Sequence, residues 1–411
     1  MTYPDRFVFL QQLNTWRGRK TAWGLKLLLG RYPAPSRALL DQVASSYHRS
    51  DELGDRVAEE LFSNPQLRER GIHPHQLLKK AVEEGSDILD DTTPALREML
   101  QQAETPPLWL EQEKLTLACE VIHRSGRFAM YALGDFALLG GYANSDIIKP
   151  LAFTGALNGN SSFDRVSETT SFWFDVTTPG GLEPGSAGYS SAVKVRVMHA
   201  LVRQRLLKHP QWNSEQWGLP INQGDAVATN VAFSMMMIAG LAMLGWRLND
   251  RELEAVLHLW RYVAYLMGDD WTLLPVNRQQ GVDWLYIIAL GSRVNPDQDC
   301  LELAHSYLEA FREVPGNRFY QSYVYWFHRA YANWFIPADI RRVLNIPKAP
   351  LLSLLPVLQF PFIRLLDVLA HRIPRVDRWL QRFGRSGQQF IVSSRLQGRD
   401  VTFADKGTMV R

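Results

Sequence analysis

The chain has 411 residues, of which 46% are hydrophobic and 21% charged, a balance typical of a folded globular protein rather than a disordered one. Its 45 basic and 42 acidic residues leave a net charge of +3, which is too small to indicate binding to nucleic acid. The two cysteines, Cys119 and Cys300, exclude a disulfide framework and a cysteine-based metal cluster, and they fit a reducing compartment.

Helical periodicity organises the first hundred residues. Three segments within residues 36–89 carry apolar side chains at i, i+3 and i+4 spacing, and proline-containing joints separate them. We therefore predict a peripheral helical layer over residues 1–107.

A more apolar and aromatic segment follows, and we predict it to be the core, over residues 108–345. The alternating apolar pattern of strands is scarce, and no Asn-Gly or Asp-Gly hairpin turn lies between β-branched runs. The predicted fold class is therefore all-α, a large helical bundle with peripheral helices. The longest apolar run, residues 231–246, is shorter than the roughly 20 residues that span a bilayer, which predicts a buried helix and no transmembrane segment. The periodicity and capping residues predict core helices over residues 109–131, 163–176, 187–208, 222–245 with Asn222 as N-cap, and 251–267 with Asp250 as N-cap.

The last part of the chain, residues 346–411, is predicted to be a basic, amphipathic arm. Between residues 346 and 385, five prolines alternate with leucine, phenylalanine and arginine, which predicts several short helical pieces. Such a segment can lie in a membrane interface, and the alternative is an arm packed on the body with its arginines in water. Because residues 1–20 do not have the pattern of a signal peptide, we expect a cytoplasmic protein with peripheral membrane contact.

Several pairs of polar residues are weak candidates for metal sites. His73 and His75 flank a proline, which favours a surface turn, and Asp269 and Asp270 follow a helix end, which favours a solvated turn over a magnesium site. Among the ten histidines, periodicity does not choose between His199, His258 and His328 as a buried ligand.

One predicted helix combines polar and aromatic residues on a single face. A face of this kind is unusual both for a plain core and for a solvated surface, and it suits the wall of a pocket that holds an apolar substrate. The residues that share this face by their spacing are Arg165, Glu168, Thr169, Phe172 and Trp173.

The next helix carries His199 between apolar and basic neighbours. Arg196 lies one turn before it and Arg203 one turn after it, so the imidazole could bind haem iron while the arginines neutralise the haem propionates. The pattern alone favours a different interpretation, a surface helix with its basic residues in water.

Three motifs occur in order across this region. They read Arg165-Val166-Ser167-Glu168-Thr169, then Val195-Arg196-Val197-Met198-His199-Ala200, then Asn222-Gln223-Gly224-Asp225. Through these motifs, residues 110–280 resemble the catalytic domain shared by bacterial latex clearing proteins (rubber oxygenases) and the fungal, MpaB-like ER-bound oxygenases that cleave prenyl side chains. The resemblance implies an all-helical protein with a globin-like core that binds one b-type haem.

The resemblance also assigns roles to residues. It implies that His199 is the proximal haem ligand and that Arg165, Thr169 and Thr229 belong to the distal side. Glu168 stands where rubber oxygenases have a lysine that can cap the iron, so here it would act as a base or as a weak oxygen ligand. The glutamate base of the family has no clear counterpart, and Lys149 or a nearby residue stands in its place. Residues that could line the pocket, or simply pack in the helix, are Phe233, Met235, Met236, Met237 and Leu241.

The resemblance implies a haem-dependent oxygenase that brings dioxygen to an unsaturated apolar substrate, either an isoprenoid or a lipid, with oxidative cleavage of a double bond as one outcome. Two alternatives stay open. The first is a haem or lipid carrier or sensor on the same fold without turnover. The second is a haem-free helical scaffold that docks to membranes through residues 346–385. An absorption spectrum separates the last alternative from the others, because only bound haem gives a Soret band.

Overall fold

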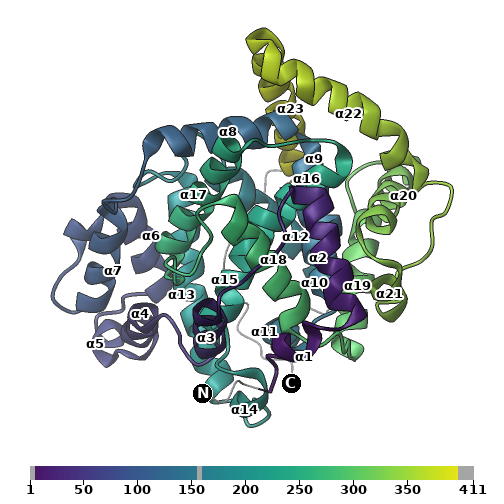
Figure 1. The fold of residues 1–411 in the computed structure, drawn as a ribbon. Helices are drawn as coiled ribbons and strands as arrows, with labels where there is room; N and C mark the ends of the chain where they lie inside the picture. The colour runs from purple at the N-terminus through teal and green to yellow at the C-terminus, as the bar shows by residue number, and fades with distance from the viewer. Residues whose placement is uncertain (1–4, 155–159, 397–411) are drawn as a thin grey trace.

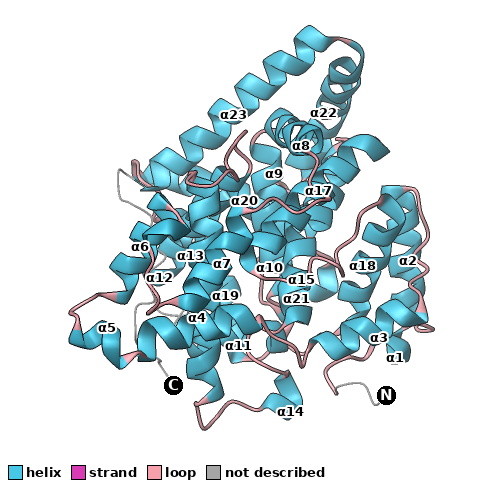
Figure 2. Ribbon diagram, turned by 90° about the vertical axis from the view of Figure 1, so that its left-hand side faces the viewer, coloured by secondary structure: helices cyan, strands magenta, loops and turns pink. Residues whose placement is uncertain are grey.

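The computed structural model describes residues 5–154 and 160–396, with the side chains of residues 5–154 and 163–395. Within these ranges all regular secondary structure is helical and there is no strand, which confirms the all-α fold class. Figures 1 and 2 show long helices at the centre, a layer of shorter helices on one side, and a helical hairpin that stands out from the body.

The N-terminal layer packs on the centre in two places: α4 and α6 contact α13, whereas α1 and α2 contact α18 on the other side (Figure 1). Its segments begin with the capping residues and prolines that the sequence shows, such as Ser36 before α3 and Pro74 at the start of α6. The elements are α1 (Phe9–Gln12), α2 (Trp16–Leu29), α3 (Arg37–Ser46), α4 (Glu52–Ser63), α5 (Pro65–Glu69), α6 (Pro74–Glu84), η1 (Ser86–Ile88) and α7 (Pro94–Glu104).

The central helices follow. They are α8 (Gln112–Ser125), α9 (Arg127–Tyr131), η2 (Ala132–Leu138), α10 (Leu139–Gly141), α11 (Ser145–Phe153), α12 (Asn160–Val176), α13 (Ala187–Leu207), α14 (Ser214–Trp217), α15 (Gln223–Val231), η3 (Ala232–Met236), α16 (Met237–Leu244), α17 (Asp250–Met267) and α18 (Arg278–Gly291). The chain continues through α19 (Gln298–Glu309), η4 (Ala310–Arg312), α20 (Arg318–Phe335), α21 (Ala338–Val343), α22 (Leu354–Arg372) and α23 (Pro374–Leu396).

The predicted buried helix is confirmed. Asn222 caps α15 by accepting a hydrogen bond from the Asp225 N–H, and the helix runs on through the π-helical η3 into α16. Gly245, with φ +110°, ends it in a left-handed conformation that favours glycine. Two helices, Gln223–Leu244 and α22, are long and apolar enough to cross a membrane by length and composition. The first is 67% buried, as expected of a core helix, whereas α22 is only 22% buried.

The predicted helix over residues 109–131 is interrupted. It ends at Ser125 because Gly126 takes φ +54°, and α9 begins directly after it. Gly384 of α23 crosses at this point so closely that a Cβ on it would overlap the His123 carbonyl oxygen. Two glycines thus allow two helix backbones to touch, and this tertiary contact overrides the local periodicity.

Two smaller expectations also change. The N-cap of α17 is Asn249 rather than Asp250, because Asn249 forms a capping box with Glu252. The prolines of the C-terminal segment do not divide it into short pieces. Pro361 lies inside the 19-residue α22 on its exposed side, and Pro374 is the first residue of the 23-residue α23, where a missing N–H costs nothing.

Candidate functional site

His199 lies near the middle of α13. Its side chain is enclosed by protein, although part of its surface stays accessible. Burial, which is the largest cause, and the positive charges of Arg203 and Arg165 lower the pKa of the imidazole to about 4. At neutral pH the ring is therefore uncharged and has a nitrogen lone pair to offer.

His199 differs from the other enclosed histidines because, within the described residues, it takes part in no hydrogen bond. The two alternatives from the sequence, His258 and His328, are both engaged. The partners of the enclosed histidines are the Thr177 carbonyl for His123 Nε2 (2.9 Å), the Glu111 N–H for His258 Nε2 (2.9 Å) and both Asp135 carboxylate oxygens for His328 Nδ1 (2.9 Å). Among the enclosed histidines that the structure describes, His199 is thus the one with both ring nitrogens uncommitted.

Arg196 and Arg203 hold α13 to the N-terminal layer. Arg196 donates from Nε and Nη2 to the two oxygens of Asp51, at 2.7 and 2.8 Å. Arg203 donates from Nε to Asp55 at 2.7 Å and from Nη1 to the Ile221 carbonyl. Because protein carboxylates already neutralise both guanidinium groups, the geometry gives them a structural role. Their role toward haem propionates stays a prediction.

The loop after α17 closes over the Arg196 ion pair. Gly268 has φ +74°, and a Cβ there would overlap both Asp51 Oδ2 and the Arg196 side chain. Gln223 fixes the loop from the third motif, since its amide donates to the Gly268 carbonyl (2.9 Å) and accepts from the Asp270 N–H (2.6 Å). Glycine is therefore required at this position both by conformation and by space.

The turn at Asp269 is less solvated than the sequence predicted. Burial, together with the negative charge of Asp51, raises the pKa of the Asp269 carboxyl to about 8, although Arg196 opposes the shift. The turn packs against the ion pair, although Asp269 keeps some accessible surface. The sequence could not show this contact, because Asp51 lies more than two hundred residues away.

The third motif fastens the start of α15. Asp225 accepts two hydrogen bonds from Arg6, from Nη1 at 2.9 Å and from Nη2 at 2.6 Å, and a third from the Asn222 side chain at 2.8 Å. Arg196, Gln223 and Asp225 therefore hold α13, the loop after α17 and the start of α15 in place. The sequence did not reveal that Arg196 pairs with Asp51 or that Asp225 pairs with Arg6. The one signal available in the sequence was the presence of charged residues within otherwise apolar helices.

The helix α12 packs against α13 and brings Arg165 to the site. Burial lowers the pKa of the Arg165 guanidinium, while the nearby Glu168 and Tyr142 oppose this effect. Its charge also acts on the His199 imidazole, so the two residues lie within electrostatic reach across the helix pair. Glu168 is half-buried and Thr169 is exposed.

The predicted pocket face of α12 divides into two parts. Phe172 and Trp173 are buried in the hydrophobic core, where they pack as ordinary core residues. Arg165, Glu168 and Thr169 keep accessible surface. The polar part of the predicted face is therefore the part that is not enclosed by the hydrophobic core.

Thr229 is exposed, although α15 runs through the centre of the molecule (Figure 1). Its hydroxyl donates to the Asp225 carbonyl of its own helix at 2.8 Å. Phe233 and Met236 continue the accessible face of this helix. Three of the five residues considered as pocket walls are instead fully buried in helix packing: Met235, Met237 and Leu241.

Lys149 does not stand where a base could act. Its ammonium group forms an ion pair with Asp297 and a second one, at 3.2 Å, with Asp299. Burial alone would lower the pKa of Lys149, but the hydrogen bonds to Asp297 raise it above its usual value. The group stays charged and fastens α11 to α19.

The donor set around His199 fits haem. Within the described residues, no three histidine, cysteine, aspartate or glutamate side chains gather to hold a metal ion. The iron of a haem already has four porphyrin nitrogens and takes one protein ligand, commonly a histidine. A single enclosed, uncharged and unbonded imidazole on a central helix meets this requirement.

Comparison with known proteins agrees with this geometry. The family described as "ER-bound oxygenase mpaB/B'/Rubber oxygenase, catalytic domain" matches residues 123–365. A rubber oxygenase of Streptomyces sp. (strain K30) is 27% identical over 178 residues, which are 42% of this chain and 42% of that protein, so the match spans less than half of the relative. The solved structure of latex clearing protein in its closed state has a TM-score of 0.61 and 20% identity, over 84% of this chain and 91% of that chain, and shares the fold. This chain therefore belongs to the family of the ER-bound mpaB-type and rubber oxygenase catalytic domains.

Proposed function

We propose that the protein binds one b-type haem through His199 and activates dioxygen beside an unsaturated, apolar substrate, an isoprenoid or a lipid. The observation that carries the proposal is the enclosed His199 imidazole, which is uncharged and has no hydrogen-bond partner within the described residues. Family membership supports it, because the relatives are described as oxygenases. Bound haem would supply the redox chemistry with dioxygen that amino-acid side chains lack.

The residues around His199 have separate tasks in this proposal. His199 offers the lone pair of a neutral nitrogen, and its depressed pKa keeps that lone pair free of a proton above about pH 4. Arg165 carries a desolvated positive charge on the facing helix, which stabilises negative charge that develops nearby. Glu168, one turn further along α12 and half-buried, is the proposed group that accepts or returns a proton at its carboxylate.

The surface that we propose to contact the substrate is apolar. Phe233 and Met236 present accessible apolar surface next to Thr229 on the central helix. Such a surface orders an alkene chain by excluding water and leaves the threonine hydroxyls as the polar contacts. An isoprenoid or an unsaturated lipid fits this chemistry better than a polar metabolite.

The proposal is tested with protein produced under haem-sufficient conditions. We expect a Soret band, about one haem per chain by the pyridine haemochrome assay, and oxygen uptake with squalene but not with squalane, its saturated counterpart. A protein without a Soret band would contradict haem binding. Haem without oxygen uptake on squalene, polyisoprene oligomers or unsaturated lipids would leave a haem-binding or lipid-binding protein on the same fold.

A further inference from the structure

The outer face of α22 is apolar and open. Leu358 and Phe362 are 67% and 69% exposed, whereas Ile363 and Asp367 on the opposite face are buried. The exposed residues of the helix follow i, i+3 and i+4 spacing and therefore form one stripe: Leu354, Leu358, Phe362 and Leu365. A continuous apolar stripe of this length marks an interaction surface on a soluble protein.

The exposed face of α23 adds aromatic and basic side chains. Trp379 and Phe383 stack at 5.4 Å and are both more than half exposed. Three arginines alternate with them, and together with Trp379 they surround a shallow hollow of about 420 Å³: Arg375, Arg378 and Arg382. Tryptophan beside arginine is typical of the boundary between lipid headgroups and acyl chains.

The α22–α23 hairpin, residues 354–396, offers only positive charge to its surroundings. Its sequence contains two carboxylates, Asp367 and Asp377. Asp367 is buried and pairs with Arg364, and Asp377 pairs with the buried Arg124. Within the described residues, no carboxylate lies within 4 Å of the outer arginines, which are Arg372, Arg375, Arg378 and Arg382.

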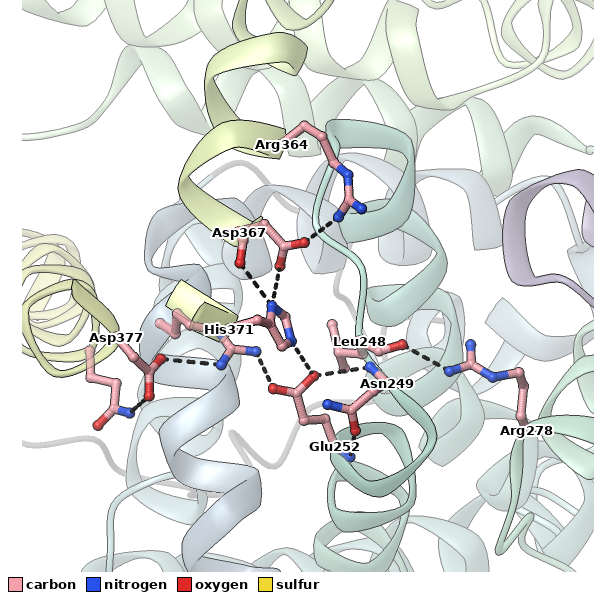
Figure 3. Close-up of polar contacts among 10 residues, drawn as sticks. Leu248, Asn249, Glu252, Arg278, Arg364, Asp367, His371 and Asp377 are labelled. Atoms are coloured by element: carbon pink, nitrogen blue, oxygen red, sulfur yellow. Dashed lines mark hydrogen bonds and ion pairs between the residues drawn. The ribbon is translucent and has the colours of Figure 1, made fainter. Parts of the chain in front are cut away.

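A polar network anchors the hairpin to the body (Figure 3). Arg124 of α8 donates to Glu252 of α17 at 2.5 Å and to Asp377 of α23 at 3.2 Å. His371 of α22 contacts the other Glu252 oxygen at 3.0 Å and the Asp367 carbonyl at 2.8 Å. The inner face of the hairpin is thereby fixed, and its outer face projects from the molecule (Figures 1 and 2).

We propose that the α22–α23 hairpin docks on the surface of an anionic lipid bilayer. The apolar stripe of α22 and the aromatic pair of α23 enter the acyl boundary, and the outer arginines contact lipid phosphates. The buried Asp367 on the inner face requires protein contact, so α22 lies on the membrane and does not span it. A second copy of the chain is a poorer occupant, because two such hairpins would face each other with like charges.

The hairpin also leads to the proposed site. Arg395 near the end of α23 donates to the Thr170 hydroxyl at 2.9 Å, next to Thr169 on α12. Docking at a bilayer would therefore bring a membrane-dissolved molecule near the helix that carries Arg165. The docking proposal itself does not depend on haem or on turnover.

The test is sedimentation of the full chain with vesicles of phosphatidylcholine alone or with 30% phosphatidylglycerol. We expect binding to the anionic vesicles that weakens as salt is raised. The triple variant Arg375→Glu, Arg378→Glu, Arg382→Glu should bind at least about 100-fold more weakly, since the loss of each basic residue near the surface accounts for roughly fivefold and the new carboxylates are repelled in addition. The matched control reverses three exposed basic residues far from the hairpin, Arg68, Lys79 and Lys208, and should bind like the unaltered protein.

A second pair of variants tests the apolar stripe. Leu358→Ser with Phe362→Ser should weaken binding to anionic vesicles without changing the helical content, because both side chains already face solvent. Both native cysteines are buried, so Ser386→Cys on α23 can carry an environment-sensitive dye. Its emission should shift to the blue on vesicles, while the same dye at Ser63→Cys on α4 should not respond.

Equal sedimentation of the unaltered protein and the arginine triple variant would overturn the proposal. So would a dimer in solution that requires Leu358 and Phe362 and does not bind vesicles, because that result would assign the surface to a second copy of the chain.

Discussion

Arg196 and Asp51 form a two-point ion pair that joins the helix of His199 to the N-terminal layer. The Nε–Oδ2 and Nη2–Oδ1 distances are 2.7 and 2.8 Å, and the Arg196 side chain is 4% exposed. Gly268 covers the pair from the other side. The position of His199, one turn further along α13, thus depends on a contact between residues 145 positions apart in sequence.

Removing this ion pair should lower the free energy of unfolding more than removing an exposed ion pair. We expect Arg196→Met to lower the free energy of unfolding by about 3–5 kcal/mol, because it leaves the Asp51 carboxylate buried without a partner. The control is Arg56→Met on α4, whose pair with Glu98 is more than half exposed and should contribute under about 1 kcal/mol. Urea denaturation followed by circular dichroism gives both values, and similar losses would refute the assigned role. Adding Asp51→Asn to Arg196→Met should recover part of the loss.

His199→Ala should abolish haem binding or move the Soret band, with helical content unchanged. The matched variant is His258→Ala, because His258 is also enclosed and has a pKa lowered to about 4 by burial. That residue accepts a hydrogen bond from the Glu111 N–H at the start of α8, so its loss should reduce stability by about 1 kcal/mol and leave haem content intact. Haem retained in the first variant and lost in the second would move the ligand to His258.

Glu168 should set the resting state of bound haem. A carboxylate is a weaker ligand than an amine, so we expect a high-spin ferric spectrum and ready binding of imidazole. Glu168→Lys should convert it toward a low-spin spectrum that resists imidazole, and Glu168→Gln should stay high-spin. A low-spin, imidazole-resistant spectrum in the unaltered protein would contradict this account.

Asp269 should make the protein less stable as the pH rises. Because its carboxyl pKa is raised to about 8 when folded, the folded state holds a proton that the unfolded chain has already released, and this proton is lost as the pH passes 8. Between about pH 7.5 and 8 we expect the free energy of unfolding to fall by at most about 1.4 kcal/mol per pH unit. Asp269→Asn should flatten this slope.

The enclosed histidines limit the pH range in which the effect of Asp269 can be measured. The enclosed His123, His199 and His258 have lowered pKa values, so below pH 6.5 the unfolded chain takes up protons that the folded state refuses. Their effect raises stability with increasing pH and is complete about one pH unit above the unfolded pKa of histidine, near pH 7.5. An unchanged slope above about pH 7.5 in Asp269→Asn would show that another group is responsible.

The sequence alone determined the helices and the order of the motifs. Apolar spacing and caps such as Asn222 predicted α12, α13 and the buried helix that begins at α15, because helix formation depends on neighbours three and four residues away. The motifs also singled out His199 as the candidate haem ligand, and the composition of the C-terminal segment predicted a basic, amphipathic arm.

Only the tertiary structure decided which polar residues form ion pairs or hydrogen bonds with one another. It assigned Arg196 and Arg203 to Asp51 and Asp55, showed Lys149 paired and Asp269 enclosed, and left His199 without a hydrogen-bond partner among the described residues. It also divided the predicted helix over residues 109–131 where Gly126 meets Gly384. These outcomes follow from contacts between residues far apart in the chain, where burial and pairing set the free energy of each charge, and local periodicity carries no information about such contacts.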